Sequence, residues 1–257
     1  MANVLVCIKR VPDTGGSVAL TADEQSVDAS RLGHTISTHE ECAIELAVQI
    51  AQATDGTASV LSLGSDDAVE QLRDALAVGC ADATLIEADG SAFGPGDVAA
   101  SIADVVETRA AEGTSYDLVL VGNDAADSGD FQVGVRLAYA LERPVLTGIS
   151  TIEVADGVAI AHGAGPTGTE VFELPLPAVI AVQEGGVEPR YPSIPGRMKA
   201  KRAPLETIMP KRDPVGSGRV RLTLPPEQPS SVQVLGQGPE AAPALVDILT
   251  EIGVISR

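Results

Sequence analysis

Short apolar runs that alternate with segments of helical periodicity constrain the fold of this chain more than any other feature of its sequence. Residues 3–9, 57–63 and 117–121 are largely apolar and lack a helical period, as expected of strands that are buried on both faces. Residues 84–86 form a shorter run of the same kind. Strands of this character separated by helices predict an α/β fold with a mainly parallel, doubly wound sheet.

Four helices are expected between and after these strands. Thr38 is the expected N-cap of the first, with Glu41 three residues later and an apolar stripe following. The second is expected to begin at Ser65 and to stop at Gly79. The third and fourth are expected over residues 97–111 and 131–141.

The pattern changes after Pro144, where short strands are joined by glycine-rich turns. We expect these strands to add antiparallel pieces to the sheet, and a small hairpin to form near the N-terminus. The later strands are predicted over residues 145–154, 158–162, 170–174 and 178–183, and the hairpin over residues 18–20 and 25–28.

The last part of the chain differs from the rest in being rich in proline and poor in periodicity. We therefore expect two domains, an α/β domain over residues 1–203 and a C-terminal arm over residues 204–257. The arm ends in a short amphipathic helix, residues 243–252. Such a segment is either disordered or wrapped around a partner, and its terminal helix favours the partner.

Charge excludes several classes of function. The net charge of −19 comes from carboxylates spread along all 257 residues, and arginine outnumbers lysine. Such a surface stays hydrated at high salt, so a halophilic source is expected. It would repel nucleic acid and anionic membranes. No apolar run is long enough to span a bilayer, and the apolar start at Val4 is too short for a signal sequence.

The reactive side chains point to no chemistry of their own. Cys7, Cys42 and Cys80 are odd in number and lie in apolar patterns, which fits reduced thiols in the cytoplasm. The three histidines have no ligand spacing with one another or with a cysteine pair, so no metal site is expected. We recognise no nucleophile–base pair and no carboxylate dyad, and we assign no catalytic residue.

The long turn after the strand at residues 117–121 is the best candidate for a ligand site. Ligands of parallel α/β sheets bind at the carboxyl ends of strands, where helix N-termini present free N–H groups. Ser128, Gly129 and the amides up to Gly134 are placed to cradle a phosphate. Spacing alone supports equally an ordinary turn with Asp127 or Ser128 as a helix cap. The carboxylates of the turn are expected to face ribose hydroxyls or solvent.

A second conspicuous stretch, residues 188–202, is basic in an otherwise acidic chain. Prolines flank Tyr191 and Ile194, which stiffens the loop and lowers the entropy lost when it docks onto a partner. On these residues alone, a proline loop packed on its own domain is the simpler interpretation.

Four stretches carry a resemblance to a known family. They are VLVCIKRVPD at the start, ECAIELAVQI in the first helix, the AAD…QVG turn, and above all the long string EPRYPSIPGRMKAKRAPLE. Over essentially its full length the chain resembles the β subunit of electron transfer flavoproteins.

The resemblance implies an αβ heterodimer with FAD mostly on the α subunit and with AMP as a structural ligand of the β subunit. It implies docking of acyl-CoA dehydrogenases or related flavoenzymes, as in fatty acid β-oxidation, and electron delivery to a quinone oxidoreductase. Ile194 would dock at the place where the family has leucine, flanked by Tyr191 and Pro195. The implied AMP site comprises Cys7, Ser37, Thr38, His39, Glu40, Leu63, Asn123, Asp124, Ala125, Ala126, Asp127, Ser128, Gly129, Asp130, Phe131, Gln132, Val133 and Gly134.

The sequence departs from the family at two points of this site. The family has Asn-Pro near Ser37 and Thr38, and glutamine in place of Asp124. In the electron-bifurcating branch a second FAD replaces AMP, and the sequence leaves that alternative open. Two other classes also stay open, a stand-alone adenine-nucleotide-binding stress-type module and an adenylate-transferring ligase. Co-purification with an FAD-bearing partner separates the carrier from both.

Overall fold

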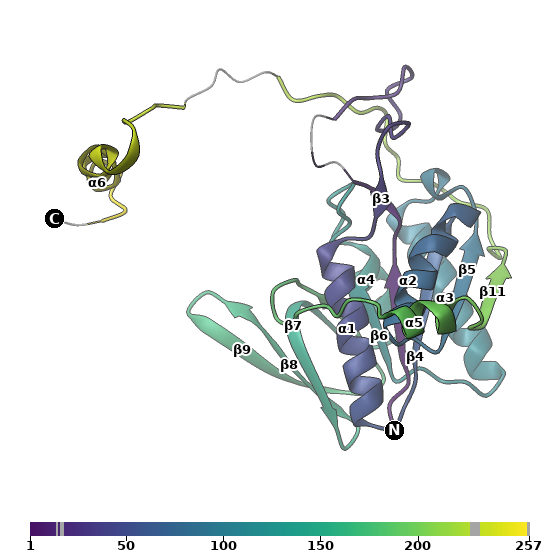
Figure 1. Cartoon of the computed structure of the whole chain (residues 1–257). Coiled ribbons are helices and arrows are strands. Elements are labelled where there is room, and N and C mark those ends of the chain that lie inside the picture. Colours follow the sequence, from purple (N-terminus) through teal and green to yellow (C-terminus); the bar gives the residue numbers. More distant parts are fainter. Residues whose placement is uncertain (14, 16–17, 227–231, 256–257) are drawn as a thin grey trace. The chain divides into compact units, whose positions relative to one another are not determined.

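The computed structural model describes residues 1–13, 15, 18–226 and 232–255. The chain divides into two units, Met1–Leu222 and Thr223–Arg257. The first unit contains the sheet and most of the helices (Figure 1). The second contains the short helix α6, Ala242–Glu251, in agreement with the predicted terminal helix.

In the described part of the chain the main sheet has nine strands in the order β11-β5-β4-β1-β6-β10-β7-β8-β9. Every pairing from β11 to β7 is parallel, and β7, β8 and β9 pair antiparallel. This confirms the predicted α/β fold with added antiparallel strands. The bounds are β1 Val4–Ile8, β4 Ala58–Gly64, β5 Asp82–Glu87, β6 Leu118–Gly122, β7 Val145–Ala155, β8 Val158–Gly165, β9 Gly168–Pro175, β10 Ala178–Val182 and β11 Leu205–Ile208.

Helices cover both faces of the sheet (Figure 1). Alternate residues of each central strand point to opposite sides, so Val4 and Val6 pack with α1 and α2 while Leu5 packs with α3 and α4. The helices are α1 Thr38–Ala53, α2 Val69–Val78, α3 Pro95–Ala111, α4 Val133–Ala140 and α5 Ile194–Ala200. This two-layered core is the doubly wound arrangement that the sequence predicted.

Two expectations about local structure were wrong. The N-cap of α1 is Ser37 with Glu40, not Thr38 with Glu41, because Ser37 Oγ accepts from the Glu40 N–H and the Glu40 carboxylate accepts from the Ser37 N–H. At Ser65 the chain first makes a 3₁₀ turn, Asp66–Ala68, and α2 starts only at Val69. Gly79 ends α2 as predicted.

The placement of the last buried strand also differs from the expectation. β10 was expected among the antiparallel pieces, yet it lies between β6 and β7 and is parallel to both. Every one of its five residues is buried, which is typical of a central parallel strand. The strand's unbroken apolar sequence was the available signal.

Two small antiparallel pairings and one edge strand complete the first unit. The predicted hairpin is present as a bridge between Leu20 and Val27. β2, Val11–Pro12, and β3, His34–Thr35, form a short pair that the sequence did not predict. β11 is likewise unpredicted, and places residues 205–208 on the edge of the sheet beside β5.

The segment after β11 lies along α3. Arg212 donates to Asp104 at 2.7 Å and Lys211 donates to Thr108 at 2.7 Å. Further along, the Asp97 carboxylate accepts from the N–H groups of Val215 and Gly216. Polar contacts, rather than buried apolar side chains, therefore hold this stretch on the domain. In the described residues no helix has the length and apolarity that crossing a membrane requires.

Candidate functional site

The structure brings the predicted nucleotide-site residues together at the carboxyl ends of β1, β4 and β6. These strands are neighbours, with β1 in the middle. An ion pair and a polar contact join the surrounding segments: Lys9 Nζ lies 2.7 Å from Asp127 Oδ1, and His39 Nε2 lies 2.6 Å from Asp124 Oδ1. We call this region, bounded by the end of β1, the start of α1 and the loop before α4, the mouth.

Glu40 is the buried carboxylate of the mouth. Its Oε1 accepts from the backbone N–H of Lys9 at 2.6 Å, and its Oε2 accepts from the N–H and hydroxyl of Ser37. The side chain is buried, and burial raises the pKa of Glu40 from 4.5 to about 7, against the opposing effect of these hydrogen bonds and of the Lys9 charge. Glu40 thus joins the start of α1 to the end of β1, and titrates near neutral pH.

Cys7 and Leu63 belong to the wall of the mouth. Cys7 is buried on β1, and burial followed by the nearby Glu40 charge raises the pKa of its thiol. A thiol that stays protonated is a poor nucleophile, and the buried Cys7 side chain packs in the core on the α3 and α4 side of the sheet. Leu63 lies on β4, two residues beyond the partner of Cys7 in the sheet.

His39 connects the mouth to the end of β10. Its Nδ1 accepts from the backbone N–H of Glu184 at 3.0 Å, so the ring proton is on Nε2, the atom facing Asp124. The Asp124 Oδ1 atom is buried and accepts no well-directed hydrogen bond in the described structure, so its 2.6 Å approach to Nε2 is a short polar contact with a neutral imidazole. Asp124 and Asp127 therefore each face a basic side chain of the same chain.

The loop before α4 uses several of its polar groups to hold its own shape. The Asn123 side chain accepts from the N–H of Gly148 at 2.8 Å and donates to Gln183 at 3.0 Å. The N–H groups of Ser128 and Gly129 both donate to the carbonyl of Ala125. These two amides, which the sequence suggested as part of a phosphate cradle, are thus already engaged.

The start of α4 keeps donors for an anion. The first N–H groups of a helix have no partner within the helix, and no side chain caps α4. Gly134 lets α4 lie close to the sheet, since a Cβ there would stand 3.0 Å from Val121 Cγ2 and 3.5 Å from Ala181 Cβ. Arg10, which follows β1, has a buried Nε without a hydrogen-bond partner among the described residues. Unpaired donors of this kind suit a phosphate.

The basic, proline-rich stretch forms an exposed tip. Tyr191 is 93% exposed, Ile194 79% and Met198 63%. Ile194 begins α5 and Met198 lies four residues further, so both are on one side of that short helix. Ser193 caps the helix by accepting from the Gly196 N–H at 3.1 Å. We call Tyr191, Ile194 and Met198 the docking tip; Met198 was missed, although its spacing from Ile194 was a usable signal.

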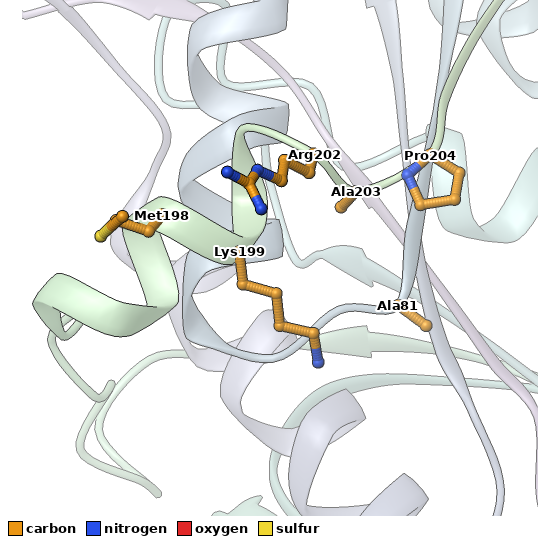
Figure 2. Close-up of a pocket in the computed structure, with 6 residues that line it drawn as sticks. All are labelled: Ala81, Met198, Lys199, Arg202, Ala203 and Pro204. Carbon is orange, nitrogen blue, oxygen red and sulfur yellow. The ribbon is translucent and has the colours of Figure 1, made fainter.

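Two hollows in the surface of the described domain contain no residue of the mouth. Figure 2 shows one of about 450 Å³ beside α5, lined by Ala81, Met198, Lys199, Arg202, Ala203 and Pro204. Another, of about 170 Å³, lies between α3 and β11. Within the described ranges no group of three His, Cys, Asp or Glu side chains is arranged to hold a metal ion.

Comparison with known proteins places this geometry in a family. The model of the electron transfer flavoprotein domain matches residues 26–212. The electron transfer flavoprotein subunit beta of Bacillus subtilis is 32% identical and covers 96% of this chain and 97% of its own length. That of Syntrophomonas wolfei is 34% identical over 90% of this chain and 89% of its own.

A relative from a different complex is nearly as similar. Subunit CarD of the caffeyl-CoA reductase-Etf complex of Acetobacterium woodii is 32% identical over 79% of this chain and 76% of its own length. The family model and the two near-full-length β subunits agree with the resemblance carried by the sequence motifs. The chain belongs to the electron transfer flavoprotein family, in the line of its β subunits.

Proposed function

We propose that this chain holds AMP and pairs with an α subunit that carries most of the FAD site. Electrons pass from acyl-CoA dehydrogenases or related flavoenzymes through that FAD to a quinone oxidoreductase. The chain serves as a carrier subunit without catalytic residues of its own. The observation that supports this most is the similarity to electron transfer flavoprotein β subunits over 96% of the chain, which includes both the mouth and the tip.

The residues of the mouth fit a nucleoside monophosphate. The N–H groups at the start of α4, and Arg10 just after β1, offer donors for the phosphate. The charge of Asp127 is partly compensated by Lys9, so this carboxylate repels an anion less. Bound AMP would stabilise the fold by mass action and supply no redox chemistry.

The nucleotide content of the purified heterodimer tests this proposal. Denaturation followed by chromatography is expected to release about one FAD and one AMP per heterodimer, since a β site of the AMP type holds no flavin. Reduction of the remaining flavin should survive partial removal of AMP. A heterodimer that contains FAD but no adenine nucleotide besides it would refute the AMP assignment.

A second candidate keeps the carrier role and changes the ligand. The similarity to CarD, a subunit of a caffeyl-CoA reductase-Etf complex, is the observation that supports this candidate. The candidate is a bifurcating-type β subunit with a second FAD in the mouth. Release of two FAD and no AMP per heterodimer would select this candidate. A stand-alone stress-type module, in turn, would purify as a colourless homodimer.

The proposed setting is the cytoplasm of a halophilic organism. The three cysteines are free and buried, which fits a reducing compartment. The net charge of −19 fits high salt. The C-terminal arm, with α6 at its end, is proposed to wrap around the α subunit.

Replacing Glu40 with glutamine is expected to flatten the pH dependence of stability of the heterodimer. Between its ordinary pKa of 4.5 and the folded value of about 7, Glu40 binds more protons folded than unfolded. Its contribution to the free energy of unfolding is therefore present below 4.5 and lost as the pH rises through 7, by on the order of 1–3 kcal/mol.

Thermal unfolding of both proteins between pH 5 and 8 measures this. Wild-type Tm should fall more steeply over that interval than the Tm of Glu40→Gln. Parallel curves would show that Glu40 titrates at its ordinary pKa.

A further inference from the structure

One side of α1 holds the link that runs from β10 to the docking tip. His39 accepts from the backbone N–H of Glu184 at 3.0 Å, as described for the mouth. The Cys42 thiol donates to the carbonyl oxygen of Val187 at 3.6 Å. Glu45, a further three residues along the helix, makes the strongest contacts of the three. In Figure 1 this link crosses α1 on its way to α5.

Glu45 and Arg190 form a two-pronged ion pair. Arg190 Nε donates to Glu45 Oε2 and Arg190 NH2 donates to Glu45 Oε1, both at 2.7 Å, and the Arg190 backbone N–H adds a bond of 3.2 Å. The Glu45 side chain is 5% exposed, and Gln49 donates to it at 2.7 Å. Burial alone would raise the pKa of Glu45, but the hydrogen bonds from Arg190 and Gln49, with the Arg190 charge, outweigh it and lower the pKa.

This pairing changes the role of Arg190. Arg190 belongs to the basic stretch at residues 188–202, in which free charges would steer a partner. Instead both prongs of the Arg190 guanidinium are engaged with α1. The Glu45 side chain is buried while 37% of the Arg190 side chain is exposed, so salt screens this pair less than it would a fully exposed pair. It can therefore hold the loop even at high ionic strength.

The docking tip lies next to this pair in the sequence. Tyr191 follows Arg190 directly, and Ile194 is four residues beyond it. On the far side of the tip, α5 packs against α2, and Arg197 lies 3.4 Å from Asp74 in an exposed pair. Arg73 of α2 also donates to the carbonyl oxygens of Ala200 and Ala203, so the tip is held at both ends.

We propose that Glu45 is a positioning residue for partner docking: its fork to Arg190 holds Tyr191 and Ile194 in the orientation that a flavoenzyme partner binds. The inference rests on the proposed docking function. A loop ordered in advance loses less conformational entropy on binding, so releasing it should weaken docking without touching the apolar contact itself.

The test uses the complete heterodimer and compares Glu45→Gln, Arg190→Lys and the control Glu41→Gln. Glu41 lies on the same helix and is exposed, so its replacement removes the same charge without touching the link. Affinity for a purified acyl-CoA dehydrogenase is measured beside hydrogen exchange over residues 187–196 and flavin reduction by dithionite, which needs no docking.

Glu45→Gln is expected to weaken docking about tenfold and to speed exchange over residues 187–196 alone, as loss of preorganisation requires. Arg190→Lys keeps the charge but loses the fork, so its loss should be smaller. Glu41→Gln should match wild type, and dithionite should reduce all four proteins equally.

Three results for the Glu45→Gln heterodimer would overturn the proposal. They are unchanged hydrogen exchange over residues 187–196, faster exchange across the whole chain, and a docking affinity equal to that of the wild type. Ile194→Ala, measured in parallel, separates the two claims. If Ile194→Ala weakens docking and Glu45→Gln does not, the positioning role of Glu45 is wrong and the docking function stands. If Ile194→Ala docks normally, the docking function itself fails at this tip, and hydrogen exchange still decides whether Glu45 holds the loop.

Discussion

Expressed without an α subunit, the chain is expected to aggregate or to fold poorly, and co-expression should yield a soluble yellow heterodimer. The reason lies in the unit Thr223–Arg257. None of the residues of α6 is buried in the described structure, although the helix is rich in apolar side chains. The exposed large apolar residues of this unit are Leu224, Val232, Val234, Leu245, Val246, Ile252, Val254 and Ile255. Apolar surface of this extent marks an interaction site or a liability for aggregation.

The measurement is the soluble yield and the molar mass of the product with and without the partner gene, at the same salt concentration. High salt has to be kept throughout, because a chain with a net charge of −19 repels itself when screening is weak. A colourless monomer from the single chain that melts cooperatively would contradict the prediction.

Replacing Ile194 with alanine is expected to weaken docking of the dehydrogenase about tenfold or more. The side chain is 79% exposed at the first turn of α5, where nothing in the described domain covers it. Burying it in a partner pocket would contribute roughly 1.5–3 kcal/mol, and about 1.4 kcal/mol corresponds to a factor of ten in affinity. At high salt the apolar contact should outweigh steering by nearby charges.

Electron transfer from a reduced dehydrogenase at limiting concentration measures the effect of Ile194→Ala. Met209→Ala is the matched control, since Met209 is also an exposed apolar side chain but lies outside the tip. The flavin spectrum and Tm of all heterodimers should agree. A wild-type rate for Ile194→Ala would mean that Ile194 has no part in recognition.

Much of the fold could be predicted because its signals are local. The apolar runs of β1, β4 and β6 identified strands buried on both faces, and Gly79 marked the end of α2. The position of β10 between β6 and β7 is not local: it depends on how the chain returns after the antiparallel hairpin. β11 was missed for a similar reason, because an edge strand with exposed residues has no strong apolar pattern.

The site was predictable as a set of residues but not as a set of contacts. Family motifs selected the segments that meet at the mouth. They gave no sign that Asn123 would be used to hold Gly148 and Gln183, or that Glu45 would pair with Arg190 across 145 positions of sequence. Such pairings depend on which helix the returning chain crosses, and this is decided by tertiary packing.

The central claim is that this chain is part of a carrier that takes electrons from a dehydrogenase. Its most direct test follows flavin absorption in the co-purified heterodimer after adding an acyl-CoA and a catalytic amount of acyl-CoA dehydrogenase. The account predicts that the oxidised flavin band bleaches by the equivalent of about one FAD per heterodimer, as expected when one dehydrogenase turns over on many carriers. It also predicts no bleaching when the dehydrogenase is left out. A flavin that stays oxidised with each dehydrogenase of this class tested, or that bleaches equally without one, would contradict it.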